Sequence, residues 1–153
     1  MTKHMHKHTR AHKHAHAHTH TQYTIPTHDR PGALWKITHA LHKHKINITA
    51  MMTEGYGDTA YIRFLTDKHH HPKKHLEKAG FHVMETPCFH IELPNHPGAL
   101  NHLTKTLALK HISLHHVYGT SNGHDSAKVV VVVDNAKKAG PVLAKWMRKP
   151  HAN

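Results

Sequence analysis

The chain has 153 residues, and its 21 lysines and arginines outnumber nine aspartates and glutamates, for a formal net charge of +12. No stretch approaches the roughly 20 apolar residues of a membrane span, and the basic N-terminus lacks the apolar core of a secretory signal, so a cytoplasmic protein without a membrane partner is expected. The single cysteine excludes an intramolecular disulfide and a thiolate metal cage. Positive charge is scattered rather than gathered in one stripe, which argues against a nucleic-acid partner.

Histidine dominates the first 22 residues, which we predict to be a disordered tail. Eight of the 25 histidines lie within the first 20 positions, alternating with lysine, alanine and threonine. Imidazoles on a flexible chain can chelate Ni²⁺, Zn²⁺ or Cu²⁺, although a purification tag or an inert arm explains the same pattern, and no cofactor is required elsewhere. The candidate metal ligands are His4, His6, His8, His12, His14, His16, His18 and His20.

The first structural unit is expected over residues 23–87. Leu34, Ile37 and Leu41 recur at helical spacing behind Pro31, which suits the first turn of a helix. The expected elements are a strand at 23–27, a helix at 31–44, strands at 46–53 and 59–66 joined by a hairpin, a helix at about 72–79 and a strand at 81–85.

The second unit, residues 88–147, repeats this order and is followed by a short tail at 148–153. Five consecutive valines, Val129 to Val133, fit a central strand that is buried on both faces. The final strand is not evident, so this sheet either lacks its last edge or takes it from another segment. The expected elements are strands at 89–93, 112–118 and 127–133 and helices at 97–110 and about 135–146.

A duplicated segment relates the two units. Asp29 to Leu34 reads Asp-Arg-Pro-Gly-Ala-Leu, and 66 positions later Asn95 to Leu100 reads Asn-His-Pro-Gly-Ala-Leu. The same apolar positions follow each copy, so the repeat is structural, and the seam between paired units is a natural place for a ligand.

With this duplicated turn, the helix behind it and the Ile-Asn-Ile or Ile-Ser-Leu start of the next strand, the chain resembles a tandem ACT domain protein. The resemblance implies an α+β fold of two ferredoxin-like βαββαβ units, with antiparallel sheets and helices on one face. It also implies an amino-acid sensor that pairs its domains in a homodimer or higher homo-oligomer, and it does not imply catalysis. The family pattern places ligand contacts at Asp29 and Asn47.

The residues themselves support a site for a small carboxylate. A helix entered through Pro-Gly has unpaired amide hydrogens and a positive dipole end at its first turn. Asparagine and aspartate ahead of the turn can accept bonds from an ammonium group, and Asn47 is expected near the same end of the sheet. Ser113 replaces Asn47 in the second copy and has a shorter reach, so the first copy is the favoured site. Turn and cap formation alone also explains these residue types. The candidate ligand-binding residues are Asp29, Arg30, Pro31, Gly32, Ala33, Asn47, Asn95, His96, Gly98 and Ser113.

The sequence favours a binding protein over an enzyme. It contains no Gly-x-Ser-x-Gly elbow, no phosphate-binding Gly-x-x-x-x-Gly-Lys loop and no His-Glu-x-x-His helix. The predicted function is therefore a regulatory sensor that binds an amino acid. The alternative is a histidine-rich protein that binds nickel, zinc or copper, with the repeats as a scaffold.

Overall fold

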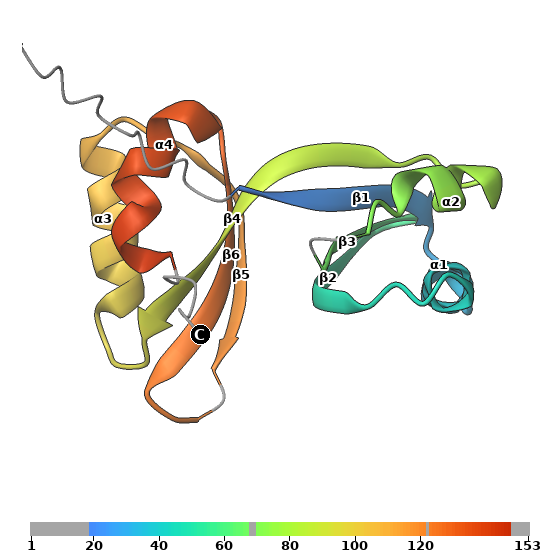
Figure 1. The fold of residues 1–153 in the computed structure, drawn as a ribbon, viewed down its shortest axis with the longest axis horizontal. Helices are drawn as coiled ribbons and strands as arrows, with labels where there is room; N and C mark the ends of the chain where they lie inside the picture. Colours follow the sequence, from blue (N-terminus) through green and yellow to red (C-terminus); the bar gives the residue numbers. More distant parts are fainter. Residues whose placement is uncertain (1–18, 68–69, 122, 148–153) are drawn as a thin grey trace, which may run out of the picture.

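The computed structural model describes residues 19–67, 70–121 and 123–147. Its strands form one antiparallel sheet of six strands in the order β2-β3-β1-β4-β6-β5. The helices of the two units lie at opposite ends of the molecule, with the strands between them (Figure 1). Two βαβ-type units are thus joined through their sheets, and the predicted α+β class is confirmed.

The first unit follows the predicted order. Its elements are β1 (His20–His28), α1 (Ala33–Lys43), β2 (Ile48–Tyr56), β3 (Thr59–Thr66) and α2 (Lys73–Lys78). Strands β2 and β3 form a hairpin closed by the pair Tyr56 and Thr59, and Gly57 adopts a φ of 58° in the tight turn, as glycine readily does. Buried side chains of α1, α2 and strands β1 and β3 form the core of this unit, which includes Ile25, Ile37, Leu41, Phe64 and Leu76.

The second unit has the same arrangement. After β4 (Met84–Pro94) come α3 (Ala99–Leu109), β5 (Leu114–Ser121), β6 (Ser126–Val133), α4 (Ala136–Leu143) and the 3₁₀ helix η1 (Ala144–Trp146). Strand β6 lies between β4 and β5, and Val129 to Val133 are all buried, which confirms the central strand predicted from the valine run. Val129, Val131 and Val133 pack under α3 and α4, whereas Val130 and Val132 face the other side of the sheet.

The predicted boundary between the units, at residues 87 and 88, falls within a single strand, β4. The sequence predicted two strands at 81–85 and 89–93, but Met84–Pro94 is one continuous strand. Its first half pairs with β1, from Met84 opposite Thr24 to Cys88 opposite His20, and its second half pairs with β6. Because each half has a ladder partner, the chain stays extended through Pro87.

The same pairing lengthens β1 and corrects the predicted tail at 1–22. β1 begins at His20 rather than at Tyr23, because the backbone of β4 offers partners to residues 20–22. In the described ladders β1 pairs with residues 84–88 of β4 and not with residues 89–94, the half that pairs with β6, so β1 does not supply a fourth strand to the second unit. No separate fourth strand of the second unit occurs among the described residues.

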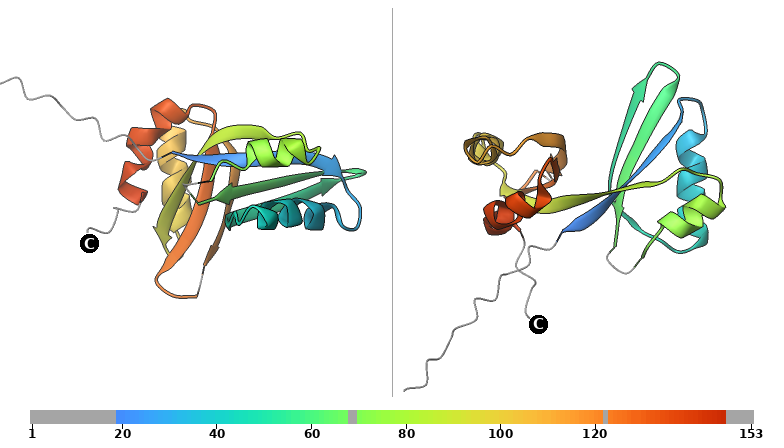
Figure 2. Two further views of the ribbon diagram at one scale, coloured as in Figure 1. Left: turned by 45° about the vertical axis from the view of Figure 1, so that its right-hand side comes forward. Right: turned by 90° about the horizontal axis from the view of Figure 1, so that it is seen from above.

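The faces of the two half-sheets that carry no helices meet near the centre of the molecule. Leu65 of β3, Cys88 of β4 and Val130 and Val132 of β6 form a third buried cluster, with Ala50 and Tyr118 packed against it. Figure 2 shows β1 and β4 running from one half to the other. This cluster joins the two units in addition to the shared strand.

Candidate ligand site at the duplicated elbows

We call the residues 29–33 and 95–99 the first and second elbow. Gly32 and Gly98 precede α1 and α3 with φ angles of 86° and 93°, and no side chain caps either helix. The duplicated glycine is needed because other residues rarely adopt such angles. A Cβ built on either glycine would meet no atom within 4 Å, so both elbows are open to an incoming group.

The first turn of each helix has amide hydrogens available to a ligand. In α3 the amide of Ala99 donates to His96 and that of His102 donates to Gly98, while the amides of Leu100 and Asn101 have no acceptor among the described residues. These hydrogens and the positive end of the helix dipole favour an anionic guest.

Each elbow is fastened to the hairpin turn between the second and third strands of its unit. The amide of Asp29 donates to the carbonyl of Asp58 at 2.8 Å, and the amide of Asn95 donates to that of Asp125 at the same distance. The side-chain Nδ2 of Asn95 also donates to the carbonyl of His124 at 2.7 Å. Asn95 thereby fixes the second elbow and keeps its Oδ1 available as an acceptor.

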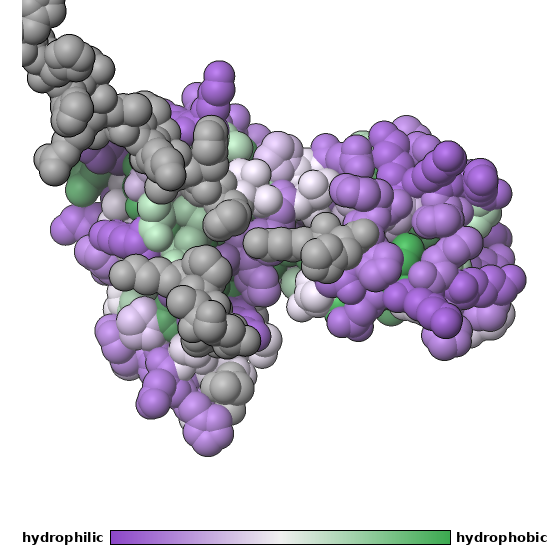
Figure 3. Space-filling model, viewed as in Figure 1, coloured by the Kyte–Doolittle hydropathy of each residue, from purple (hydrophilic) through white to green (hydrophobic). Residues whose placement is uncertain are grey.

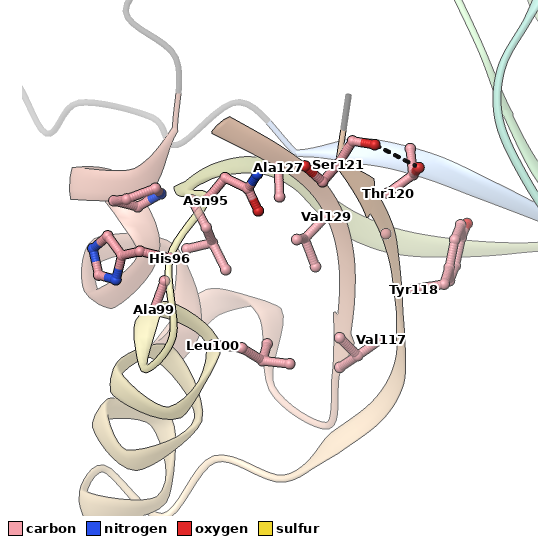
Figure 4. A pocket seen from close by; sticks show the side chains of 13 residues that line it. Asn95, His96, Ala99, Leu100, Val117, Tyr118, Thr120, Ser121, Ala127 and Val129 are labelled. Atoms are coloured by element: carbon pink, nitrogen blue, oxygen red, sulfur yellow. Dashed lines mark hydrogen bonds between the residues drawn. The ribbon is translucent and has the colours of Figure 1, made fainter. Parts of the chain in front are cut away.

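A pocket of about 320 Å³ opens at the second elbow, between the start of α3 and strand β5 (Figure 4). Leu93, Ala99 and Val129 form its apolar floor, and Leu100 and Val117, which are 49% and 37% exposed, form its rim. The remaining lining residues are Pro94, Asn95, His96, Tyr118, Gly119, Thr120, Ser121 and Ala127. An apolar cavity with a few polar groups and a helix N-terminus at its edge has the composition of a small-molecule site.

The first elbow is arranged differently. The carboxylate of Asp29 lies against Gly55 of β2, where an added Cβ would come within 2.5 Å of Oδ2. The hollow beside this elbow, about 580 Å³, lies on the α2 side and includes Arg30 and Ala33 but not Asp29. Although the sequence favoured the first copy, the structure places the apolar pocket at the second.

Asn47 and Ser113 lie far from the elbows, which corrects the expectation that Asn47 shares their end of the sheet. Ile48 pairs with Thr66, whereas Tyr56 pairs with Thr59 beside the first elbow. These two pairs stand at opposite ends of the eight-residue strand β3, about 23 Å apart at 3.3 Å per residue. An 11-residue helix carries the chain back along its strand, so the residue after it lies at the other end.

Ser113 repeats this placement in the second unit. Its amide donates to Oδ1 of Asp134 at 3.1 Å, and its carbonyl accepts from the amide of Asp134 at 3.0 Å. Within one chain, neither Asn47 nor Ser113 can touch a ligand held at the elbow of its own unit.

The pocket wall is connected to the first unit through Tyr118. Its hydroxyl donates to Oε1 of the fully buried Gln22 at 3.1 Å, and His116 lies 3.4 Å from Nε2 of the same side chain. Burial raises the pKa of Tyr118, which keeps the hydroxyl protonated as a donor. Nearby, Arg63 pairs with Glu54 at 2.8 Å, and hydrogen bonds from Tyr56 and Arg63 hold the pKa of Glu54 below its usual value.

The proposed metal ligands lie almost entirely outside the described residues. His4, His6, His8, His12, His14, His16 and His18 belong to that part of the chain, while His20 lies in β1 opposite Cys88. Within residues 19–67, 70–121 and 123–147, no three histidine, cysteine or acidic side chains are grouped so that they could hold a metal ion. In the same part of the chain, no helix is long and apolar enough to cross a membrane.

Sequence reasoning missed the wall of the pocket that β5 supplies. Val117, Tyr118 and Thr120 are distant in sequence from the duplicated turn and carry no motif of their own. The one signal in the sequence was the repetition of the final leucine of the duplicated segment, Leu34 and Leu100. In the structure these two side chains are 39% and 49% exposed, although the sequence placed Leu34 on the apolar face of its helix.

Comparisons with known proteins agree with this architecture. Residues 27–79, which make up most of the first unit, match the family model of the ACT domain. Protein BT0572 from Bacteroides thetaiotaomicron is 27% identical with a TM-score of 0.76, over 83% of this chain and 88% of that one. No curated protein matches the chain.

Two further structures share the fold at lower identity. The ligand-free regulatory subunit of aspartate kinase from Thermus thermophilus has a TM-score of 0.61 at 15% identity, over 85% of this chain and 93% of that one. The corresponding subunit from Thermus flavus has a TM-score of 0.62 at 16% identity, over 83% and 92%. The predicted fold of two ferredoxin-like units is therefore confirmed.

Proposed function

We propose that this chain is a regulatory protein that binds a small amino acid at the second elbow. The ACT domain over residues 27–79 and the likeness to aspartate kinase regulatory subunits support a regulatory binding role. The observation that carries the proposal is the apolar pocket of about 320 Å³ at the start of α3. Its size suits a ligand of a few to about a dozen heavy atoms rather than a macromolecule.

The ligand's three parts have matching groups. Its carboxylate accepts from the amides of Leu100 and Asn101 at the first turn of α3. Its ammonium group donates to Oδ1 of Asn95 or to the hydroxyl of Thr120. Its side chain enters the cavity above Leu93 and Val129 and replaces water there, which favours an apolar amino acid.

Binding would be transmitted through association of two copies. The exposed rim residues Leu100 and Val117 are apolar, and a second copy of the chain could bring Asn47 or Ser113, which lie far from the elbow of their own unit, to a bound ligand. A ligand held between two copies can favour their association only if it binds the paired state more tightly than the single chain. We therefore expect a homodimer or larger homo-oligomer whose association constant changes with the amino acid.

Calorimetric titration with the 20 common amino acids, in buffer with EDTA, tests this function. At least one apolar amino acid should bind, and binding should be lost in Val117→Trp, which fills the pocket, and weakened about tenfold in Asn95→Ala, which frees the elbow. Asp29→Ala, the matched change at the first elbow, should leave binding intact. Loss of binding only in Asp29→Ala would move the site to the first elbow, and failure of every amino acid to bind would refute the sensor.

The metal-binding alternative stays a prediction that rests on histidines before residue 19. Titration of the same protein with Ni²⁺ and Zn²⁺ in EDTA-free buffer, before and after removal of residues 1–18, tests it. Metal binding that disappears with this segment, while amino-acid binding persists, would assign the two properties to separate parts of the chain.

A further inference from the structure

A second groove lies on the outer side of the first unit, between α1 and α2. It has a volume of about 430 Å³, and its walls carry three lysines, three histidines and one tryptophan. Figure 3 shows that hydrophilic residues cover most of this side of the molecule in the view drawn. Its lining includes Trp35, Lys36 and Lys43 of α1 and His75 and Lys78 of α2.

The positive charge of this groove is not neutralised. None of its described lining residues is acidic, and none of the ion pairs in the described part of the chain involves Lys36, Lys43 or Lys78. The nearest carboxylate along α2, that of Glu77, lies 3.9 Å from Lys73 instead. Three ammonium groups around one hollow therefore favour an anion with several negative charges.

The histidines add to this preference. His44 and His75 stack with their ring centroids 3.8 Å apart, and partial burial together with His44 and the lysines of α2 lowers the pKa of His75. A bound anion would relieve this repulsion between cationic groups.

An aromatic surface stands at the same groove. Trp35 is 63% exposed, which is unusual for so large an apolar side chain, and its ring stacks on that of His39 at 5.1 Å. The exposed ring area offers a platform on which a planar ring can stack.

The second unit does not keep this groove open. His102 stands where Lys36 stands in the first unit, and the ring of Trp146 packs edge-on against it with centroids 5.6 Å apart. Trp146 also packs against the core of the second unit, so its side chain occupies the position that corresponds to the groove. The open cationic groove is a property of the first unit, and not of the repeated fold.

We propose that the groove between α1 and α2 binds a small anion that carries two or more phosphate groups and a planar ring, the chemical class of nucleoside di- and triphosphates. The phosphates lie among Lys36, Lys43 and Lys78, and the base stacks on Trp35. This site is separate from the pocket at the second elbow.

Calorimetry on the full chain, with ATP, ADP, AMP, adenosine and tripolyphosphate as probes and EDTA present, tests the proposal. Affinity should fall in the order ATP, ADP, AMP, with no detectable binding of adenosine. Lys43→Glu/Lys78→Glu should weaken ATP binding by at least tenfold, because each exposed charge is reversed rather than removed. Trp35→Ala should weaken ATP about tenfold and leave tripolyphosphate unchanged.

The matched control is Lys105→Glu/Lys110→Glu, on α3 and directly after it, which changes the net charge by the same amount at two other exposed lysines. It should leave ATP binding within about twofold, since general attraction to a basic protein is screened by salt. Equal losses in the two double variants, or no ATP binding to the parent protein at 100 µM, would overturn the proposal. Amino-acid binding at the second elbow should persist in all of these variants, so the two proposals fail independently.

Discussion

The hydrogen bond between Tyr118 and Gln22 joins the open faces of the two units and can be measured directly. Gln22 belongs to β1 and is 0% exposed, while Tyr118 belongs to β5, 96 residues away. The bond from the tyrosine hydroxyl to Oε1 is 3.1 Å long. The two other contacts of the glutamine, with Thr24 at 3.5 Å and His116 at 3.4 Å, are too long to contribute much.

The expected magnitudes follow from this geometry. Tyr118→Phe removes the donor and leaves Oε1 of Gln22 buried without it, which should lower the free energy of unfolding by about 1–2 kcal/mol. Gln22→Ala also removes buried methylene groups, and should cost about 2–3 kcal/mol. Because the two changes remove the same bond, the double variant should be about 1 kcal/mol more stable than the sum of the single losses predicts.

Urea unfolding at pH 8, followed by circular dichroism and extrapolated linearly to water, gives these free energies. Tyr56→Phe is the control, because it removes an exposed hydroxyl bonded to Glu54 at 2.7 Å and should have a much smaller effect. A coupling energy near zero between Gln22 and Tyr118 would refute the view that this bond holds the two faces together.

Three further predictions concern stability and reactivity. Burial and the nearby Arg63 guanidinium lower the pKa of His116, so the unfolded chain binds a proton at this residue more readily than the folded chain does. The free energy of unfolding should therefore fall as pH drops below about 6.5, and His116→Gln should flatten this slope. An identical slope for the parent protein and the variant, in urea titrations from pH 8 to 5, would contradict this. Gly119→Ala places a Cβ 2.6 Å from a backbone carbonyl of β6 and should lower the free energy of unfolding by about 1–3 kcal/mol. Gly55→Ala should lower it less, because its Cβ meets only the side chain of Asp29, which can turn away. Equal melting temperatures for the two variants would contradict this. Burial raises the pKa of Cys88 to about 12, so a thiol reagent at pH 8 should label it only after denaturation, and rapid labelling of the native protein would show that the contact between the units opens.

The sequence predicted well those helices and strands whose own residues carry a regular apolar pattern. The spacing of Ile37 and Leu41 indicated α1, and the run from Val129 to Val133 indicated a strand with two buried faces. In both cases the apolar residues lie on a single helix or strand, and their spacing follows the geometry of that element. The sequence therefore predicted the two repeated units and their order of helices and strands.

The features that depend on distant partners were not predicted. Residues 86–88 carry no apolar alternation, and they stay extended because β1 pairs with them, a contact that no local pattern reports. The pocket depends on Val117 of β5 lying opposite Leu100 of α3, again a tertiary contact. The position of Asn47 is different, since the length of α1 alone places it at the far end of the sheet.

The continuous course of β4 means that the two repeats were joined without a linker. A cut between Pro87 and Cys88 would divide a strand, strip its neighbours of backbone partners and expose Cys88 and Leu65 to water. Neither repeat produced alone would be a finished domain, and each would be prone to aggregate.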